Sequence, residues 1–285
     1  MTRPRRSVLY IPGSNARALE KARTLPADTL ILDLEDAVAP DAKDLARTQV
    51  CDAVKSKMFG KREVVVRINA LSTPWGDADL AATAAASPDA ILVPKVSGPQ
   101  DLQEIERRSG NGSARLWAMV ETPSAILNIA DLAGAGGRLC CLVMGTNDLI
   151  KELRGVHTQD RRNLTAALGL SVLAARAHGL AIIDGVYNDI QNADGFADAC
   201  MQGKSFGFDG KTLIHPSQIA PCNAIFAPSA DEVESARKII AAFELPENRG
   251  KGAIKLDGRM VELLHAESAR RTVALADAIT QLERP

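Results

Sequence analysis

The sequence contains eight short apolar runs, most of which end in a charged or polar residue. They span residues 7–11, 29–34, 63–68, 90–93, 116–120, 139–144, 181–183 and 206–208. Segments with apolar residues at helical spacing lie between them, for example 102–108 and 164–178. Eight strand–helix units with polar residues at the carboxyl ends of the strands predict an α/β fold, a (β/α)₈ TIM barrel. A doubly wound sheet is the alternative, but it would gather its ligands at one switch point.

The barrel is expected to occupy residues 1–225 as the catalytic domain, and residues 226–285 to form a C-terminal helical extension and lid. More chain follows the eighth run than one closing helix requires. Ser229 and Glu232 form a capping box that predicts a helix over 229–245. The glycine-containing stretch 247–260 is interpreted as a loose arm, which leads into a final helix over 261–282.

Charge and hydropathy exclude several classes of partner. The chain has 34 basic and 35 acidic residues, a formal net charge of −1, so no overall field attracts nucleic acid or an anionic membrane. No run approaches the roughly 20 apolar residues of a membrane span. The run after the basic amino terminus stops at Pro12 and is too short for a signal peptide. A small metabolite is therefore the expected ligand.

The cysteines indicate a cytoplasmic protein with reduced thiols. Their number is odd and their spacing is not that of metal ligands. They are Cys51, Cys140, Cys141, Cys200 and Cys222.

Two carboxylates are the first candidates for a functional site. Glu121 and Asp148 each follow an apolar run, the position from which a buried parallel strand presents functional side chains. Two such carboxylates can share one divalent cation. Either residue alone could instead belong to a cap of the following helix. Because several other runs also end in charged residues, we favour an active site.

An acidic cluster and an arginine follow two other runs. Asp33, Glu35 and Asp36 place three carboxylates within four residues, which is costly unless cations or water neutralise them. Arg67 ends the next run and needs an anionic partner inside a barrel. It forms either a structural ion pair with the acidic cluster or a substrate clamp. We favour the clamp, because Asn69 follows at the same strand end.

Three further basic residues are candidates for binding the ligand or for catalysis. Arg17 and Lys21 lie four residues apart on one face of a predicted helix and could hold phosphates. A solvated helix face is the commoner role of such a pair. Lys95 follows the fourth run, where a lysine can serve as a Schiff-base nucleophile. For Lys95 we favour an ion pair with Glu35 or Asp36.

Eight motifs in order resemble the citrate lyase β-subunit and malyl-CoA (citramalyl-CoA) lyase family of the HpcH/HpaI aldolase group. The resemblance covers nearly the whole chain. The motifs are LYIPG at 9–13, LDLEDAV at 32–38, VRIN at 66–69, VPKV at 93–96, ETP at 121–123, G-x-x-D-L at 145–149, GFDGKTLIHPSQI at 207–219 and DGRM at 257–260.

The resemblance implies a metal-dependent lyase. It would cleave or form a short 3-hydroxyacyl-CoA, such as malyl-CoA or citramalyl-CoA, yielding a short acyl-CoA such as acetyl-CoA and a 2-oxo acid, glyoxylate or pyruvate. By resemblance, Mg²⁺ or Mn²⁺ binds Glu121 and Asp148. Arg67 stabilises the thioester enolate. Glu35 and Asp36 lie close to the metal and act through its waters or by orienting Arg67 and Lys95, and all four are counted among the catalytic residues. Residues expected to hold CoA are Tyr10, Pro12, Gly13, Arg17 and Lys21.

The family also implies an oligomer. Its members form trimers or hexamers in which the lid of one subunit closes the site of the next. Asp257 resembles the family's acid/base aspartate, so we expect a homo-oligomer such as a homotrimer with Asp257 acting in trans. The alternative for this residue is a surface Asp-Gly turn.

Another reading is a subunit of a citrate lyase complex. Such a subunit would act on citryl-CoA or on a citryl group carried by an acyl carrier protein, or would be non-catalytic. The presence of Glu121, Asp148, Arg67 and Asp257 argues for catalysis.

Overall fold

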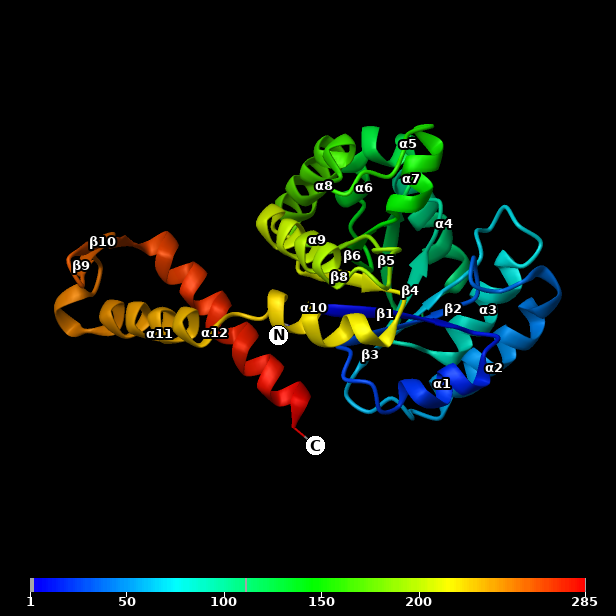
Figure 1. Cartoon of the computed structure of the whole chain (residues 1–285), viewed down its shortest axis with the longest axis horizontal. Coiled ribbons are helices and arrows are strands. Elements are labelled where there is room, and N and C mark those ends of the chain that lie inside the picture. The colour runs from blue at the N-terminus through cyan, green and yellow to red at the C-terminus, as the bar shows by residue number, and fades with distance from the viewer. Residues whose placement is uncertain (1–2, 111, 285) are drawn as a thin grey trace. The chain divides into compact units, whose positions relative to one another are not determined.

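The computed structural model describes residues 3–110 and 112–284, and the chain divides into two compact units (Figure 1). One unit comprises Arg5–Asn223. The other comprises Ala224–Pro285 together with Met1–Pro4, of which only residues 3–4 and 224–284 are described. Each unit is described by itself below.

The larger unit is a closed barrel of eight parallel strands. Each strand pairs with the next along the chain, and β1 also pairs with β8, which closes the sheet. This confirms the predicted (β/α)₈ TIM barrel. The strands are β1 (Ser7–Pro12), β2 (Thr29–Asp33), β3 (Glu63–Arg67), β4 (Ala90–Val93), β5 (Arg115–Val120), β6 (Leu139–Met144), β7 (Ala181–Asp184) and β8 (Gly210–Leu213).

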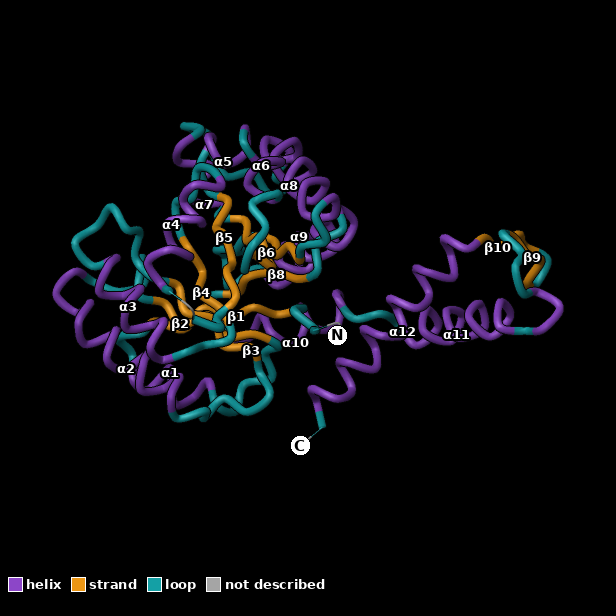
Figure 2. Tube along the Cα trace, turned by 180° about the vertical axis from the view of Figure 1, so that it is seen from behind, coloured by secondary structure: helices purple, strands orange, loops and turns teal. Residues whose placement is uncertain are grey.

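Helices surround these strands (Figure 2). The predicted helices at 102–108 and 164–178 are present as α4 and α8, and the segment that follows Pro40 forms η1 and α2. In chain order they are α1 (Ala16–Ala22), η1 (Pro40–Ala42), α2 (Lys43–Lys55), α3 (Gly76–Ala86), α4 (Pro99–Ser109), α5 (Pro123–Leu127), α6 (Ile129–Ala133), α7 (Thr146–Glu152), η2 (Arg162–Leu164), α8 (Thr165–Ala177), α9 (Ala193–Phe206), η3 (Pro216–Gln218) and α10 (Ile219–Phe226).

The barrel interior is filled by side chains from its strands. Val65 and Leu92 belong to this core, and Trp117 is fully buried within it. Branched apolar residues on alternating strand positions are the usual filling of such a barrel.

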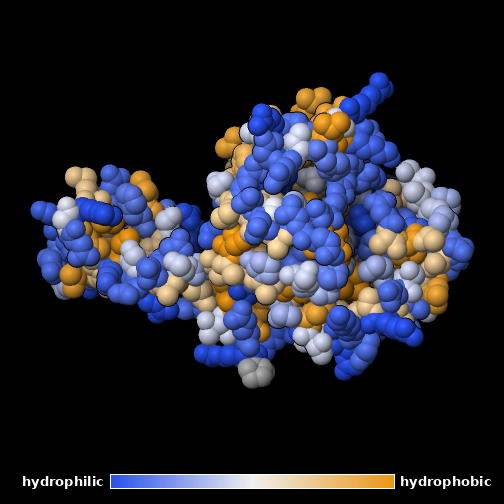
Figure 3. All heavy atoms as spheres, in the orientation of Figure 1, coloured by the Kyte–Doolittle hydropathy of each residue, from blue (hydrophilic) through white to orange (hydrophobic). Residues whose placement is uncertain are grey.

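The face shown in Figure 3 is mainly hydrophilic, with scattered apolar residues. Within the described ranges, no helix has the length and apolar character needed to cross a membrane. The five cysteines form no disulfide, as predicted.

The predicted eighth strand at 206–208 is wrong. Phe206 is the last residue of α9, Gly207 caps that helix with a φ of 99°, and the strand is Gly210–Leu213. The strand was missed because it contains Lys211, a charge that is unusual in a barrel interior. The Lys211 ammonium is fully buried and lies 3.0 Å from the Asp184 carboxylate, which is also fully buried. An ion pair of this kind allows a lysine inside a core.

The smaller unit contains two packed helices and a hairpin. Its elements are α11 (Ala230–Glu244), η4 (Pro246–Asn248), β9 (Ala253–Leu256), β10 (Arg259–Glu262) and α12 (Leu263–Glu283). The Ser229–Glu232 capping box is present. The loose arm predicted at 247–260 is wrong in part, because β9 and β10 pair antiparallel there. Asp257 and Gly258 have φ values of 48° and 79°, as tight hairpin turns require.

We predict that Gly210→Ala destabilises the barrel. A Cβ at this position would overlap the backbone carbonyl oxygen of Arg5, which cannot move without disturbing the β1–β8 closure. Overpacking of this kind costs roughly 1–3 kcal/mol or more, so the urea midpoint should fall clearly.

Gly169→Ala is the matched control. Gly169 lies in α8, and the nearest atom to its new Cβ would be 4.0 Å away, so this variant should gain up to about 1 kcal/mol from helix propensity. Equal midpoints for the two variants would contradict the close packing of Gly210.

Candidate active site

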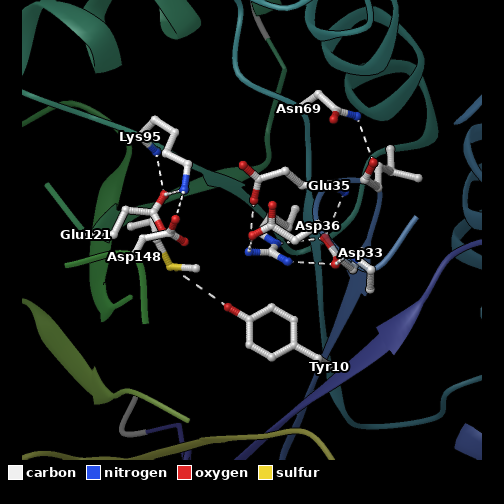
Figure 4. Close-up of polar contacts among 12 residues, drawn as sticks. Tyr10, Asp33, Glu35, Asp36, Asn69, Lys95, Glu121 and Asp148 are labelled. Atoms are coloured by element: carbon white, nitrogen blue, oxygen red, sulfur yellow. Dashed lines mark hydrogen bonds and ion pairs between the residues drawn. The ribbon is translucent and has the colours of Figure 1, made fainter. Parts of the chain in front are cut away.

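A cavity of about 300 Å³ lies at the carboxyl ends of the strands. It is lined by most of the predicted reaction residues, which come from elements far apart in the sequence. These are Asp36, Arg67, Glu121 and Asp148, and Tyr10, which was predicted to hold CoA, also lines the cavity. Lys95 and Glu35 contact this group without lining the cavity themselves (Figure 4). Barrel closure therefore assembles the predicted site.

Glu121 and Asp148 are linked by the side chain of Lys95. The Lys95 Nζ lies 2.9 Å from Asp148 Oδ1 and 3.5 Å from Glu121 Oε1, and the Lys95 backbone N–H donates to Glu121 Oε1 at 2.8 Å. The predicted ion pair of Lys95 with Glu35 or Asp36 is therefore wrong. Lys95 follows β4 and Glu121 follows the neighbouring strand β5, whereas Glu35 and Asp36 follow β2, which is not adjacent to β4.

The two carboxylates fit a divalent cation. The Glu121 side chain is only 1% exposed, and its Oε2 has no hydrogen-bond partner among residues 3–110 and 112–284. Burial raises the pKa of Glu121 to about 7, although Lys95 acts in the opposite direction. A buried carboxylate with an unpaired oxygen favours a further cation. Mg²⁺ commonly takes one or two protein carboxylates and completes its shell with other oxygens.

Gly145 allows the two carboxylates to come together. A Cβ at this position would overlap the Glu121 side chain. Gly145 precedes α7, which carries Asp148 in its first turn. The glycine therefore lets β6 end directly against Glu121. No cluster of three or more His, Cys, Asp or Glu residues suited to a metal occurs in the described part of the chain, so a metal here would complete its shell with water or substrate oxygens.

Arg67 is held by the acidic cluster and also faces the cavity. Its Nε and Nη2 each donate to Asp33 at 2.7 Å, and Nη1 lies 2.9 Å from Glu35 Oε2 and 3.5 Å from Asp36. Burial would raise the pKa of Asp33, but Arg67 outweighs it and holds that pKa below its usual range. Burial raises the pKa of Glu35 to about 8 despite Arg67. The structural ion pair exists, and it orients a guanidinium that lines the cavity.

The residues predicted to hold CoA lie in two different settings. The Tyr10 side chain lines the cavity, and Arg17 and Lys21 are exposed on α1. Packing alone requires a glycine at position 13, because a Cβ there would lie 2.6 Å from the Asp33 carbonyl oxygen. Asp257 belongs to the smaller unit, in the hairpin turn described above.

Several lining residues were missed by sequence reasoning. Thr212 and Ile214 belong to the segment around β8, which was placed a few residues too early. Met119 and Met144 lie within apolar runs and gave no signal beyond that of a strand. Asp33 belonged to the recognised acidic cluster, but its pairing with Arg67 was left open.

A (β/α)₈ barrel with ionisable side chains around a cavity at the carboxyl ends of its strands is the architecture of an enzyme. The chain matches the HpcH/HpaI aldolase/citrate lyase family over residues 6–216 and belongs to that family. The resemblance found in its motifs is thereby confirmed, and the protein is an enzyme of a family that includes CoA-thioester lyases and thioesterases.

Three similar proteins span almost the whole chain. A (3S)-malyl-CoA thioesterase of Cereibacter sphaeroides is 52% identical over 97% of this chain and 96% of its own. The citrate lyase subunit beta of Escherichia coli is 35% identical over 97% and 94%. The structure of CitE from Mycobacterium tuberculosis in complex with magnesium, acetoacetate and coenzyme A has a TM-score of 0.76 and 30% identity, covering 94% of this chain and 97% of that one.

We predict that Arg67→Met destabilises the barrel strongly. The substitution leaves Asp33 buried without its cation, and breaking a buried pair costs about 3–5 kcal/mol. Thermal and urea unfolding should both show the loss. Arg107→Met is the control, because its pair with Glu104 is exposed and Arg108 also contacts Glu104. If both variants unfold at the wild-type midpoint, Arg67 is not a structural element of the site.

Proposed function

We propose that this enzyme hydrolyses malyl-CoA, or a closely similar CoA thioester, with the help of Mg²⁺. The observation that carries the proposal is the pair of Glu121 and Asp148 beside Arg67 in one cavity. The (3S)-malyl-CoA thioesterases of Cereibacter sphaeroides support the substrate, since they are 50–52% identical over 97% of the chain. CitE of Mycobacterium tuberculosis, solved with magnesium and coenzyme A, supports the cofactor and the thioester.

The residues have distinct roles in this proposal. Mg²⁺, when bound, would act as a Lewis acid on oxygens of the acyl group. Glu121 and Asp148 would hold it, and Arg67 would face negative charge that develops on the substrate. Glu35 and Asp36 would orient Arg67. In hydrolysis, a water oxygen bonds to the thioester carbon, the carbon–sulfur bond breaks, and the thiolate takes up a proton, which yields malate and free CoA.

Carbon–carbon cleavage is the second candidate and the reaction expected from the sequence. It would yield glyoxylate and acetyl-CoA from the same substrate, or pyruvate from citramalyl-CoA. Structures of the Mycobacterium tuberculosis protein with magnesium and pyruvate, or with oxaloacetate, favour a site for 2-oxo acids. These proteins are 29% identical to this chain. Both reactions require the same pair of carboxylates, Glu121 and Asp148, to hold the metal, and both act on the same acyl group.

A Schiff-base mechanism at Lys95 is less well supported. Burial would lower the pKa of Lys95, but Asp148 and Glu121 outweigh it and raise that pKa above its ordinary value. A protonated amine is no nucleophile. A partnership with an acyl carrier protein stays a prediction. It belongs to the alternative in which this chain acts as a citrate lyase subunit, and the citrate lyase subunit beta of Escherichia coli is a similar protein.

The contacts to CoA and the lid are also part of the proposal. Arg17 and Lys21, one turn apart on the exposed face of α1, would bind the CoA phosphates. Pro12, the last residue of β1, pairs with Asp33, and the Gly13 N–H donates to the Asp33 carbonyl oxygen. Pro12 and Gly13 would lie along the pantetheine arm of CoA. Asp257 would serve as the acid/base residue of a neighbouring subunit in a trimer or hexamer.

Product analysis tests the reaction. Purified protein with Mg²⁺ and malyl-CoA should release a free thiol and malate in equal amounts, and a chelator should abolish the release. Glyoxylate and acetyl-CoA without free thiol would instead establish the cleavage reaction. Turnover that persists unchanged in chelator, or imine trapping at Lys95 by borohydride, would contradict the metal mechanism.

Subunit mixing tests the role of Asp257. Asp257→Ala and Glu121→Gln should each be inactive alone. If Asp257 acts in trans, hybrid oligomers contain some sites with both an intact Glu121 and an intact Asp257, so mixing should restore part of the activity. Mass spectrometry verifies subunit exchange. Hybrids that exchange but stay inactive would show that Asp257 serves its own subunit or has no catalytic role.

A further inference from the structure

The Tyr10 side chain lines the cavity from a position inside β1 rather than at the end of the strand. Tyr10 precedes Pro12 by two residues on β1, and Pro12 is the residue that pairs with Asp33. Two strand residues span about 7 Å, so Tyr10 lies that far along β1 from Pro12, towards the amino end of the strand. On β5, Met119 precedes Glu121 by the same two residues. We call Tyr10 and Met119 the floor of the cavity, because each lines it from two residues deeper along its own strand than Pro12 and Glu121.

The Tyr10 hydroxyl has only a weak partner. Its hydrogen-bond contact within the described residues is to the Met119 sulfur, at 3.9 Å (Figure 4). A thioether is a poor acceptor, and a phenol in a partly buried position normally finds an oxygen or nitrogen. The hydroxyl thus points into the cavity with its donor capacity largely unused.

Arg67 packs against the ring that carries this hydroxyl. Its guanidinium carbon lies 4.8 Å from the centre of the Tyr10 ring, on which it stacks as a cation on an aromatic face. Burial raises the pKa of Tyr10 well above its ordinary value, although Arg67 acts in the opposite direction. The phenol is therefore neutral near pH 7 and is a donor rather than a base.

The guanidinium itself is largely occupied. Its Nε and Nη2 donate to Asp33, and Nη1 lies against Glu35 and Asp36. A ligand at the cavity floor therefore meets a neutral phenol donor, backed by a cation whose own donors are mostly committed to carboxylates.

A CoA thioester must leave its long arm outside the cavity mouth, so the far end of its acyl group points to the floor. In a malyl group that far end is a carboxylate. We propose that the Tyr10 hydroxyl binds this carboxylate and thereby selects acyl groups that end in an acid. The inference rests on the proposed function for its substrate, and it adds a specificity-determining residue.

The test measures binding of the free acids rather than turnover. Calorimetry on the Mg²⁺-loaded protein would record the affinities of malate and glyoxylate for wild type, Tyr10→Phe and Tyr187→Phe. Tyr187 is the matched control, because it is the other of the two tyrosines in the chain and packs on Phe196 outside the cavity lining. Loss of one hydrogen bond to a carboxylate should weaken binding to Tyr10→Phe about tenfold, or 1.4 kcal/mol. The control should bind as wild type does.

A second readout separates recognition from packing. Tyr10→Phe should lower the preference for malyl-CoA over 3-hydroxybutyryl-CoA, which lacks the terminal carboxylate, by a similar factor, with an unchanged thermal midpoint. Equal acid affinities for wild type and Tyr10→Phe would overturn the role of Tyr10 and leave the proposed function standing. A wild-type protein that binds neither acid in the presence of Mg²⁺ would overturn both.

Discussion

The closure of the barrel, with β1 paired to both β2 and β8, is the constraint on which the site depends. It brings strand ends that are distant in the sequence around one cavity, so that the acidic cluster after β2 faces the carboxylates after β5 and β6. Gly210 allows the close backbone approach that this closure needs, and Gly145 leaves room for the Glu121 side chain. The chemistry of the site is thus a consequence of strand order.

Charge balance then determines what the cavity can bind. Two cations, Arg67 and Lys95, each contact more than one carboxylate. Burial nevertheless raises the pKa of Glu35 to about 8 and that of Glu121 to about 7, so the attraction of the two cations does not offset the desolvation of these carboxylates. A divalent cation would complete this balance. Lys95 stands between the two carboxylates that would hold it, so binding of the metal requires its ammonium to move.

Much of the fold and of the candidate site could be predicted from the sequence, and each wrong prediction has a physical cause. Apolar runs identified seven strands, and the rule that barrels place functional side chains at carboxyl ends correctly grouped Arg67, Glu121 and Asp148. β8 was misplaced because its buried Lys211 resembles a surface residue until Asp184 is seen beside it. The ion-pair partner of Lys95 was predicted wrongly, because it depends on which strands are neighbours and on how far the lysine side chain reaches. Tyr10 was named only through the family resemblance, as a residue that holds CoA. Its side chain facing the cavity gave no signal of its own, because Tyr10 lies inside an apolar run.

The most direct test of this account is an anomalous diffraction experiment on crystals soaked in Mn²⁺. A cation held by Glu121 and Asp148 should give a single strong peak with an oxygen of each residue at about 2.1 Å, close to the distances of Mg²⁺, and with the Lys95 ammonium moved out from between them. Crystals saturated with Mn²⁺ that show no peak there, with Lys95 still bridging the two carboxylates, would contradict the assignment of the metal site.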